Sequence, residues 1–306
     1  MTPARLLFAG VLAVAWAVAA VPSVRAQVPG EDEGGPTVRD TGVGYIDSAI
    51  PFSNMRLRVD SAYNISRPNR AEYIYARGAP FGPGLPFAES RVDYQDIRSY
   101  IEYSPRGIFS GFIELPVRFL NPQINDAASG LGDMNLGAKW AFWRTWDTVV
   151  TGQFRTYVPS GNARLGLGNN HVSLEPGILF NHQLAELVRL EGEFLYWVPA
   201  GGTSFAGSLF QYGLGLTFLQ QHPQDFWFTP VAEFVAWTVL GGHESAFHSN
   251  QFVTVESAAG DTIVNAKLGV RAGLGTFMDV YAGYGRALTG DAWYKDIFRV
   301  EFRVRF

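Results

Sequence analysis

The chain ends in nine residues that alternate strictly between apolar and charged side chains: Phe298-Arg299-Val300-Glu301-Phe302-Arg303-Val304-Arg305-Phe306. Successive side chains of a β-strand point to opposite faces, so one face of this strand is apolar and the other is charged. An edge strand of a soluble sheet can show the same alternation. An unbroken apolar face that ends in a terminal Phe is more typical of the last strand of a membrane barrel, with the apolar face toward lipid and the charged face toward the lumen.

The same period-two pattern recurs in eleven segments upstream. They are 55–64, 97–103, 113–118, 133–142, 150–156, 172–181, 188–196, 210–218, 226–239, 264–274 and 278–285, of which 226–239 alternates least regularly. With the last strand they predict twelve strands, and about ten residues are enough for a tilted strand to cross a bilayer. Because lipid offers no partner to backbone N–H and C=O groups, such strands must close on themselves. The predicted fold class is therefore all-β, a transmembrane antiparallel up-and-down β-barrel.

The connections between these segments alternate in length. The long ones are 66–91, 119–130, 159–169, 199–207, 240–261 and 287–292, and the short ones are 104–107, 144–147, 182–186, 220–225 and 275–277. Bacterial barrels have short periplasmic turns and longer outer loops, and an even strand number places both termini on one side. We therefore expect a protein of the cell outer membrane, surrounded by outer-membrane lipid, with both termini in the periplasm. The C-terminal strand ending at Phe306 is the expected contact for the barrel-assembly machinery.

The N-terminus has the parts of a secretory signal peptide. Arg5 is basic, Leu6 to Val21 is apolar apart from Gly10, and Val24-Arg25-Ala26 has small residues where a signal peptidase cleaves. Sixteen residues are short for the ~20 that a membrane anchor helix needs, so we expect cleavage after residue 26. We divide the chain into a signal peptide (1–26), a periplasmic leader (27–54) and the barrel (55–306). Within the leader, residues 44–54 either cover the barrel mouth or enter the lumen.

The composition of the mature chain excludes several kinds of partner and site. Removing residues 1–26 takes away Arg5 and Arg25 but no acid, so 22 of the 24 Lys and Arg remain against 28 Asp and Glu, a net charge of −6. That charge argues against a nucleic-acid partner. The chain has no Cys, which rules out disulfides, a lipid anchor on Cys, thiolate metal sites and a Cys nucleophile. We expect no cofactor and no metal.

Aromatic residues gather near the predicted strand ends. They are Trp140, Trp143 and Trp146 at one turn, Trp197 and Trp237 at two strand tops, and residues 226–228 at a strand base. Aromatic rings favour the two membrane–water interfaces, so we expect these residues to form girdles on the lipid-facing surface.

Charged side chains recur on the face opposite the apolar one. In this register they are Arg56, Arg58, Asp60, Arg98, Glu102, Glu114, Arg118, Asp133, Lys139, Arg155, Glu175, Arg189, Glu191, Glu193, Glu233, Lys267, Arg271, Asp279, Arg299, Glu301, Arg303 and Arg305. A twelve-stranded barrel is wider than the roughly eight-stranded size that side chains fill alone, so its lumen must hold water, a plug or a dense network of ion pairs. We expect eight of them, placed near mid-strand, to line a pore constriction: Arg98, Glu102, Glu114, Arg155, Glu175, Arg189, Glu191 and Arg271. Glycines on the same face, such as Gly137 and Gly177, either leave the lumen open or ease strand curvature.

One part of the chain resembles a known family. Residues 129–140 read Ser129-Gly130-Leu131-Gly132-Asp133-Met134-Asn135-Leu136-Gly137-Ala138-Lys139-Trp140, and the next strand ends in Val158-Pro159-Ser160-Gly161. A Gly-Leu-Gly-Asp opening, a strand ending in Lys and an aromatic residue, and a following Pro-Ser/Thr-Gly resemble the outer-membrane β-barrel family named for the meta-pathway of phenol degradation. The family usually has Thr at the position of Ser160. The resemblance covers roughly residues 96–306 and implies uptake of small, often aromatic compounds without catalytic residues.

These observations predict an outer-membrane channel or transporter for passive uptake of small solutes, including aromatic or hydrophobic compounds. A structural or partner-binding barrel with a closed lumen is one alternative. A barrel-embedded lipid hydrolase is another, and it needs a Ser near a His on the lipid-facing wall. His171 and Ser173 share the luminal face and the chain has no Gly-x-Ser-x-Gly, so we expect no enzyme. His243 and His248 flank Glu244 in a predicted outer loop, where we expect solvated side chains and not metal ligands.

Overall fold

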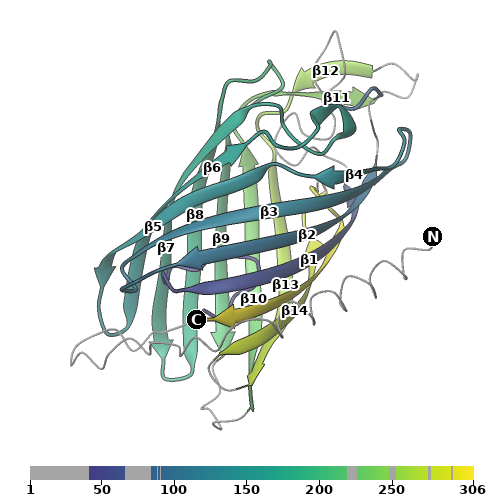
Figure 1. The fold of residues 1–306 in the computed structure, drawn as a ribbon. Coiled ribbons are helices and arrows are strands. Elements are labelled where there is room, and N and C mark those ends of the chain that lie inside the picture. The colour runs from purple at the N-terminus through teal and green to yellow at the C-terminus, as the bar shows by residue number, and fades with distance from the viewer. Residues whose placement is uncertain are drawn as a thin grey trace.

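The structure of the chain is a computed structural model that describes residues 41–65, 84–87, 89, 91–218, 226–247, 253–274, 277–290 and 292–306. The expected signal peptide, the leader up to residue 40, most of the 66–91 connection, the turn 220–225 and His248 lie outside these ranges. The described strands are steeply tilted and wrap around one lumen (Figure 1).

The described strands are named in chain order. They are β1 (Asn54–Ile65), β2 (Val92–Tyr103), β3 (Phe109–Pro122), β4 (Ala128–Leu131), β5 (Met134–Arg144), β6 (Thr148–Val158), β7 (Val172–Ala185), β8 (Val188–Ala200), β9 (Leu209–Phe218), β10 (Phe226–Val239), β11 (His243–Phe247), β12 (Val253–Ser257), β13 (Thr262–Leu274), β14 (Met278–Ala287) and β15 (Asp296–Arg305), with one short 3₁₀ helix, η1 (Ala163–Leu165). Every pairing between them is antiparallel, and each barrel strand pairs with its neighbours in the chain, as in an up-and-down barrel.

The sheet closes through β1, which pairs with β2 on one side and with β15 on the other. β4 and β5 follow each other along β3 and occupy one position, whereas β11 and β12 form a separate hairpin inside the predicted outer loop 240–261. The barrel therefore has twelve strand positions, which confirms the predicted fold class and strand number.

The connection predicted at 119–130 is mostly strand. β3 continues to Pro122, and β4 returns along it with Phe119 opposite Ser129. Asn121 and Pro122 are typical loop residues, yet they are the last residues of β3. The stretch therefore extends the barrel wall. Regular pairing lapses opposite Pro116, which has no N–H to donate, and there Gly132 N–H donates to the carbonyl of Pro116 at 2.9 Å.

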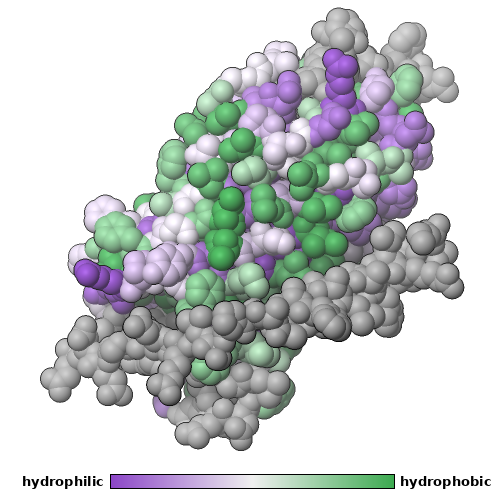
Figure 2. Space-filling view, in the orientation of Figure 1, coloured by the Kyte–Doolittle hydropathy of each residue, from purple (hydrophilic) through white to green (hydrophobic). Residues whose placement is uncertain are grey.

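The outer face of the barrel is apolar and the inner face is charged. In β15, Phe298 and Val300 are half exposed while Arg299 and Arg303 are buried inside the barrel. Other exposed apolar side chains around the wall are Leu115, Leu136, Phe154, Ile178, Phe194, Leu214, Phe234, Leu268 and Val280. Figure 2 shows this apolar surface across the middle of the visible face, between more hydrophilic ends. A lipid-facing barrel wall requires this arrangement, so the predicted alternation is confirmed.

Aromatic residues of the β5–β6 turn lie where the girdle was predicted. Trp140, Trp143 and Trp146 are all exposed, and so are Phe226 and Phe228 at the start of β10. Exposed rings at the end of the barrel wall are what the predicted girdle requires.

The girdle prediction is wrong for Trp197, Trp237 and Trp227. Trp227 shares its strand face with Glu233, and its ring lies beside Gly273 on the inner face of β13. Trp197 is buried within the barrel, and Trp237 is partly buried against the same internal cluster. Trp197 shares its strand face with Glu193, and Trp237 shares its face with Glu233, so the two-residue period places both rings in the lumen.

No helix in the described ranges combines the length and apolar character needed to span a membrane.

Candidate functional site

The lumen has two ends that differ in chemistry. The turn end is the end at which β1 begins, β15 ends and the short connections lie, and the loop end is the opposite one, which carries the β11–β12 hairpin (Figure 1).

Ion pairs fill the lumen near the turn end. Asp279 of β14 contacts the guanidinium groups of Arg271 at 2.5 Å, Arg303 at 2.8 Å and Arg305 at 2.6 Å. Arg271 also contacts Glu301 at 2.9 Å. These bonds join β13, β14 and β15 across the inner face, and all but Arg305 are almost fully buried. Buried charges require such partners, because removing one partner leaves another charge without solvent.

A second set of ion pairs lines the strands β1 to β5. Arg118 of β3 forms two hydrogen bonds of 2.6 Å to Asp96 of β2. Glu102 accepts a hydrogen bond from Lys139 at 3.2 Å and lies 3.5 Å from the guanidinium of Arg56. The planar guanidinium–carboxylate contacts fix the orientation of each side chain against the wall.

Residues 41–53 lie inside the lumen, which answers the open question about the end of the leader. We call this stretch the inserted segment. The backbone N–H groups of Gly44, Tyr45 and Ile46 donate to the buried carboxylate of Glu233 at 3.2, 2.9 and 3.0 Å. Non-strand backbone at membrane depth is tolerated where luminal side chains satisfy its polar groups, and Glu233 does so here.

Cationic side chains bind the carbonyl groups of the inserted segment. Arg271 donates to the carbonyl oxygens of Gly42 at 3.0 Å and Val43 at 2.7 Å, and Arg299 donates to that of Gly44 at 2.6 Å. The arginines that pair with wall carboxylates therefore also hold this stretch of chain in place.

The inserted segment also contributes its own charge. The carboxylate of Asp47 is 2.6 Å from the guanidinium of Arg155 and accepts a hydrogen bond of 2.9 Å from Gln153. The N–H of Asp47 donates to Glu193 at 2.8 Å. The segment is thus bonded to strands on several sides of the lumen.

Glycine is required at two positions of the inserted segment because the backbone passes close to the wall. A Cβ atom on Gly44 would lie 2.3 Å from the ring of Tyr281, and one on Gly42 would lie 2.7 Å from the side chain of Thr217. Such distances are well inside van der Waals contact, so only glycine lets the chain lie flat on these side chains.

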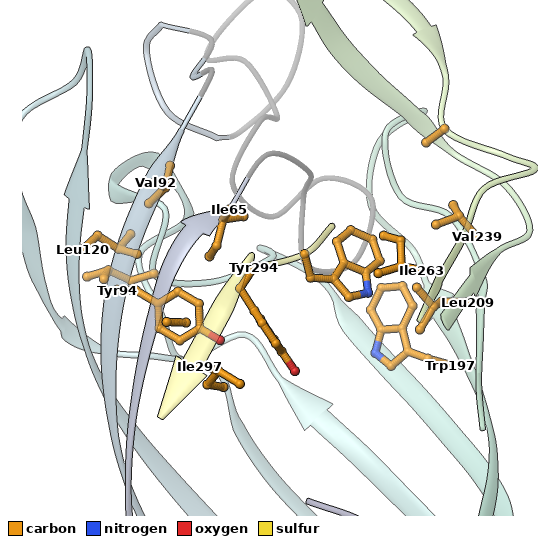
Figure 3. Close-up of a cluster of buried hydrophobic side chains, with 14 of the residues drawn as sticks. Ile65, Val92, Tyr94, Leu120, Trp197, Leu209, Val239, Ile263, Tyr294 and Ile297 are labelled. Carbon is orange, nitrogen blue, oxygen red and sulfur yellow. The ribbon is translucent and has the colours of Figure 1, made fainter. Parts of the chain in front are cut away.

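The loop end of the lumen is apolar. Its buried side chains, which we call the apolar layer, are Ala62, Ile65, Leu85, Val92, Tyr94, Leu120, Tyr157, Leu167, Trp197, Leu209, Val239, Ala258, Ile263, Trp293, Tyr294 and Ile297. Figure 3 shows many of them converging from strands on different sides of the barrel toward its interior. Burial raises the pKa of Tyr294, which lies in the β14–β15 connection, well above its usual value, so its hydroxyl group stays neutral.

Most of the predicted constriction residues take part in the ion pairs. Arg98 contacts Asp96 at 2.9 Å and Glu114 at 3.4 Å, and Arg155 contacts Glu175 at 2.8 Å. The structure brings these side chains together on the inner face. That they line the narrowest part of a pore stays a prediction.

Of the other four predicted constriction residues, two bind the inserted segment and two lie near the ends of their strands. Glu191 accepts a hydrogen bond of 3.0 Å from the N–H of Gly42, and Arg271 binds the same stretch. Arg189 is the second residue of β8, and Glu102 is the last but one of β2. These two lie at the turn end and not near mid-strand, and they already held these places in the predicted segments 97–103 and 188–196, so the mid-strand assignment is wrong for them.

Luminal glycines make room for large neighbours. A Cβ atom on Gly137 would lie 2.4 Å from the ring of Phe112, and one on Gly177 would lie 2.2 Å from Leu195. The idea that these glycines leave the lumen open is wrong at both positions, since other side chains fill the space.

The family-like motif fastens a loop-end connection to the barrel wall. Asp133, predicted among the luminal charges, instead accepts hydrogen bonds from the backbone N–H of Gly161 at 3.0 Å and of Asn169 at 2.7 Å. The hydroxyl of Ser160 donates to the carbonyl of Gly132 at 2.8 Å. The two halves of the motif therefore contact each other directly where β4 gives way to β5.

Three of the described residues were considered for catalysis or metal binding in the sequence analysis: His171, Ser173 and His243. Ser173 and His171 are buried on the inner side of the wall, and Nδ1 of His171 donates to the carbonyl of Asn169 at 2.9 Å. Nδ1 of His243 donates to the carbonyl of Ser204 at 2.6 Å. Over the ranges given above, no group of three or more His, Asp or Glu side chains is arranged to hold a metal ion.

Sequence reasoning missed the apolar layer, although the alternation contained its signal. Ile263 shares its strand face with Lys267, and Ile297 shares its face with Arg299. Extending each alternating face to the loop end of its strand would have found these residues.

No known family model matches the chain, and no curated protein matches it. Among solved structures, an outer-membrane channel from Pseudomonas putida F1 is similar with a TM-score of 0.55 and 12% identity, over 87% of this chain and 100% of that one. The β domain of the Bordetella autotransporter BrkA is similar with a TM-score of 0.50 and 11% identity, over 83% and 100%. The NanC porin has a TM-score of 0.47 and 10% identity, over 82% and 98%.

At these identities the similarity to the first two structures concerns the fold. The resemblance to the phenol meta-pathway family stays a prediction. The chain has the fold of the outer-membrane β-barrels.

Proposed function

We propose that the protein is a passive outer-membrane channel for small solutes that carry an aromatic or otherwise apolar group. The observation that carries the proposal is the layered lumen, with an apolar layer at one end and an ion-paired region beyond it. In this proposal the loop end faces the outside and both termini lie in the periplasm. A solute meets the apolar layer first and the charged region second.

The apolar layer supplies selectivity. Burying an aromatic ring removes apolar surface from water, and ring contacts with Trp197, Tyr94 or Tyr294 add a preference for aromatic groups. A purely polar solute of the same size gains neither contribution. The layer therefore favours solutes that an ordinary water-filled pore would not distinguish.

The inserted segment supplies the gate. It is held by hydrogen bonds and ion pairs, such as those to Glu233 and Arg155, and not by wall pairing. When the segment moves, water that enters the lumen with the solute replaces it as the partner of these charged groups, which lowers the net cost of breaking each bond. A solute passes when the segment yields, while the wall pairs keep the barrel intact.

A closed barrel is the second candidate, and the dense pairing of buried charges favours it. Asp279 alone binds three arginines, and the inserted segment fills the space beside them. Conductance in planar bilayers separates the candidates, since a closed barrel gives no measurable current.

Liposome swelling with two neutral glucosides tests the channel. Phenyl glucoside is larger than methyl glucoside, so an unselective pore passes it more slowly. We expect the reconstituted protein to pass phenyl glucoside about threefold faster, given the magnitude of single ring contacts. The Trp197→Ala protein loses the preference, and Trp140→Ala, on the outer surface, keeps it.

Two results oppose the proposal. Liposomes that fail to swell with either glucoside favour the closed barrel. Faster entry of methyl glucoside into wild-type liposomes indicates a simple sieve in which the apolar layer plays no part in selection.

A further inference from the structure

Lys267 of β13 is a buried cation without an acidic partner among the described residues. It is 4% exposed. The other buried Lys and Arg side chains of these strands each form an ion pair with an acid, and they are Arg56, Arg118, Lys139, Arg271, Arg299 and Arg303. An unpaired buried charge costs stability unless something else compensates it, so Lys267 requires an explanation.

The acid that should neutralise Lys267 is turned elsewhere. Glu233 is directly opposite Lys267 in the register of β10 and β13. Its carboxylate accepts hydrogen bonds from the inserted segment, at residues 44–46, and from the hydroxyl of Tyr281 at 3.1 Å. The position of the inserted segment therefore leaves the ammonium group of Lys267 without its cross-strand partner.

Aromatic rings surround the ammonium group. Its Nζ atom lies 4.0 Å from the ring centroid of Tyr45, 5.3 Å from that of Trp237 and 5.7 Å from that of Tyr294. Cation–π contacts stabilise the charge, but they leave the three N–H donors of the lysine without acceptors. The group is thus held in place and still able to bind an anion.

Further polar groups without partners lie beside it. Asn265 shares the inner face of β13 with Lys267, is fully buried, and neither its amide nitrogen nor its oxygen has a hydrogen-bond partner. The buried Nε1 of Trp293 also lacks a partner, and its ring lies 6.5 Å from that of Trp237. Together these groups form a set of donors where the apolar layer meets the ion-paired region.

We propose that Lys267 binds the carboxylate of an aromatic monocarboxylic acid in transit through the lumen. This inference rests on the proposed channel function and names its substrate class. The ammonium of Lys267 and the amide of Asn265 donate to the carboxylate, and the ring of the acid lies against the apolar layer. One free cation matches one negative charge, and the carboxylates of Glu233 and Glu193 nearby oppose a second.

The test uses benzoate and benzamide, which have nearly the same shape and differ in charge. Calorimetric titration of the full-length protein in amphipol measures both affinities near neutral pH. We expect wild-type protein to bind benzoate about tenfold more tightly, as one charge-assisted hydrogen bond provides. Lys267→Met makes the two affinities equal by weakening benzoate alone, and Lys267→Arg keeps the preference.

Lys139→Met is the matched control, because Lys139 is also buried but already pairs with Glu102. We expect it to retain the preference for benzoate. If Lys267→Met does not fold, Asn265→Leu replaces it, with an expected loss of about half of the preference in logarithmic terms.

Three outcomes overturn the inference: equal affinities in the wild type, no binding of either probe, and a Lys267→Met protein that still prefers benzoate. Each is distinguishable from failure of the channel proposal. If the phenyl glucoside preference persists in liposomes while benzoate shows no advantage, the channel stands and the carboxylate site falls.

Discussion

The two ends of the lumen are built from the same strands and the same inward face, yet their chemistry is opposite. Along β13, the inward residues change from Ile263 at the loop end to Arg271 near the turn end. Along β15 they change from Ile297 to Arg303. Alternation with a period of two decides which side of the wall a residue faces, and position along the strand decides which layer it joins.

The difference shows how this barrel uses its interior. At the turn end, buried charges are compensated by each other and by the inserted segment, which gives a rigid and specific network. At the loop end, rings and branched side chains pack without directional bonds. Lys267 lies where the two meet, with the rings of Tyr45, Trp237 and Tyr294 around its ammonium group and Glu233 opposite it in register.

Deleting residues 41–53 is expected to have the largest effect, and it changes the conductance of the channel. If the inserted segment closes the turn-end half, its loss raises single-channel conductance in planar bilayers severalfold, since twelve strands enclose more space than wall side chains fill. Aromatic preference in liposomes persists, because the deletion removes Tyr45, which packs against the apolar layer, but none of the residues of the layer itself.

Deleting the thirteen residues 28–40 is the matched control, with an expected conductance equal to that of the wild type. A deletion of 41–53 that leaves the current unchanged would show that the wall ion pairs close the lumen without the segment.

A second test removes one charge from the turn-end network. Asp279→Asn leaves Arg271, Arg303 and Arg305 without their shared carboxylate, so we expect it to lower the free energy of unfolding by about 3 kcal/mol. Urea titration of the protein in lipid measures the loss. The reversal potential in a salt gradient should shift toward anion selectivity, because the lumen gains net positive charge.

Asp296→Asn makes the same charge change at the loop end of the barrel, on the outward face of β15. Asp296 lies 3.6 Å from Arg286, whose side chain is exposed, and such surface pairs contribute at most about 1 kcal/mol. The hydrogen bond of 2.5 Å from the hydroxyl of Tyr284 can still be accepted by the amide oxygen of Asn. Equal destabilisation by the two substitutions would contradict the idea that the turn-end network is the more tightly coupled layer.

Much of the fold was predictable because lipid imposes a strict pattern. Phe298 and Arg299 differ in burial as the alternation required, and strand number and closure followed from the requirement that every backbone group be paired. The girdle prediction failed for Trp197, because aromatic residues near strand ends were assigned to the outer surface by residue type, without asking which face of the strand they occupy.

The sequence left open whether the inserted segment enters the lumen, and its contacts were beyond prediction for a different reason. Gly42, Gly44 and Asp47 have no periodicity, and their partners, such as Glu233 and Arg271, are more than a hundred residues away in the chain. Only the closed barrel brings these groups together. The free ammonium of Lys267 was hidden as well, because Glu233 stands opposite it in register and would be taken for its partner.

The smallest expected effect concerns the wall outside both layers. Ser160→Ala removes the hydroxyl that donates to Gly132 and accepts from the N–H of Met134, each at 2.8 Å. Ser160 is exposed, so water compensates part of the loss, and we expect unfolding to become easier by about 1 kcal/mol or less. Ser160→Thr, the usual residue of the resembled family, keeps both bonds and should match the wild type in urea titration. The connection that the motif fastens contributes Leu167 to the apolar layer. The other bonds of the motif, from Gly161 and Asn169 to Asp133, remain in both variants, so conductance and glucoside preference should stay the same. A change in selectivity with Ser160→Ala would mean that the Ser160 hydroxyl is needed to hold Leu167 in the apolar layer.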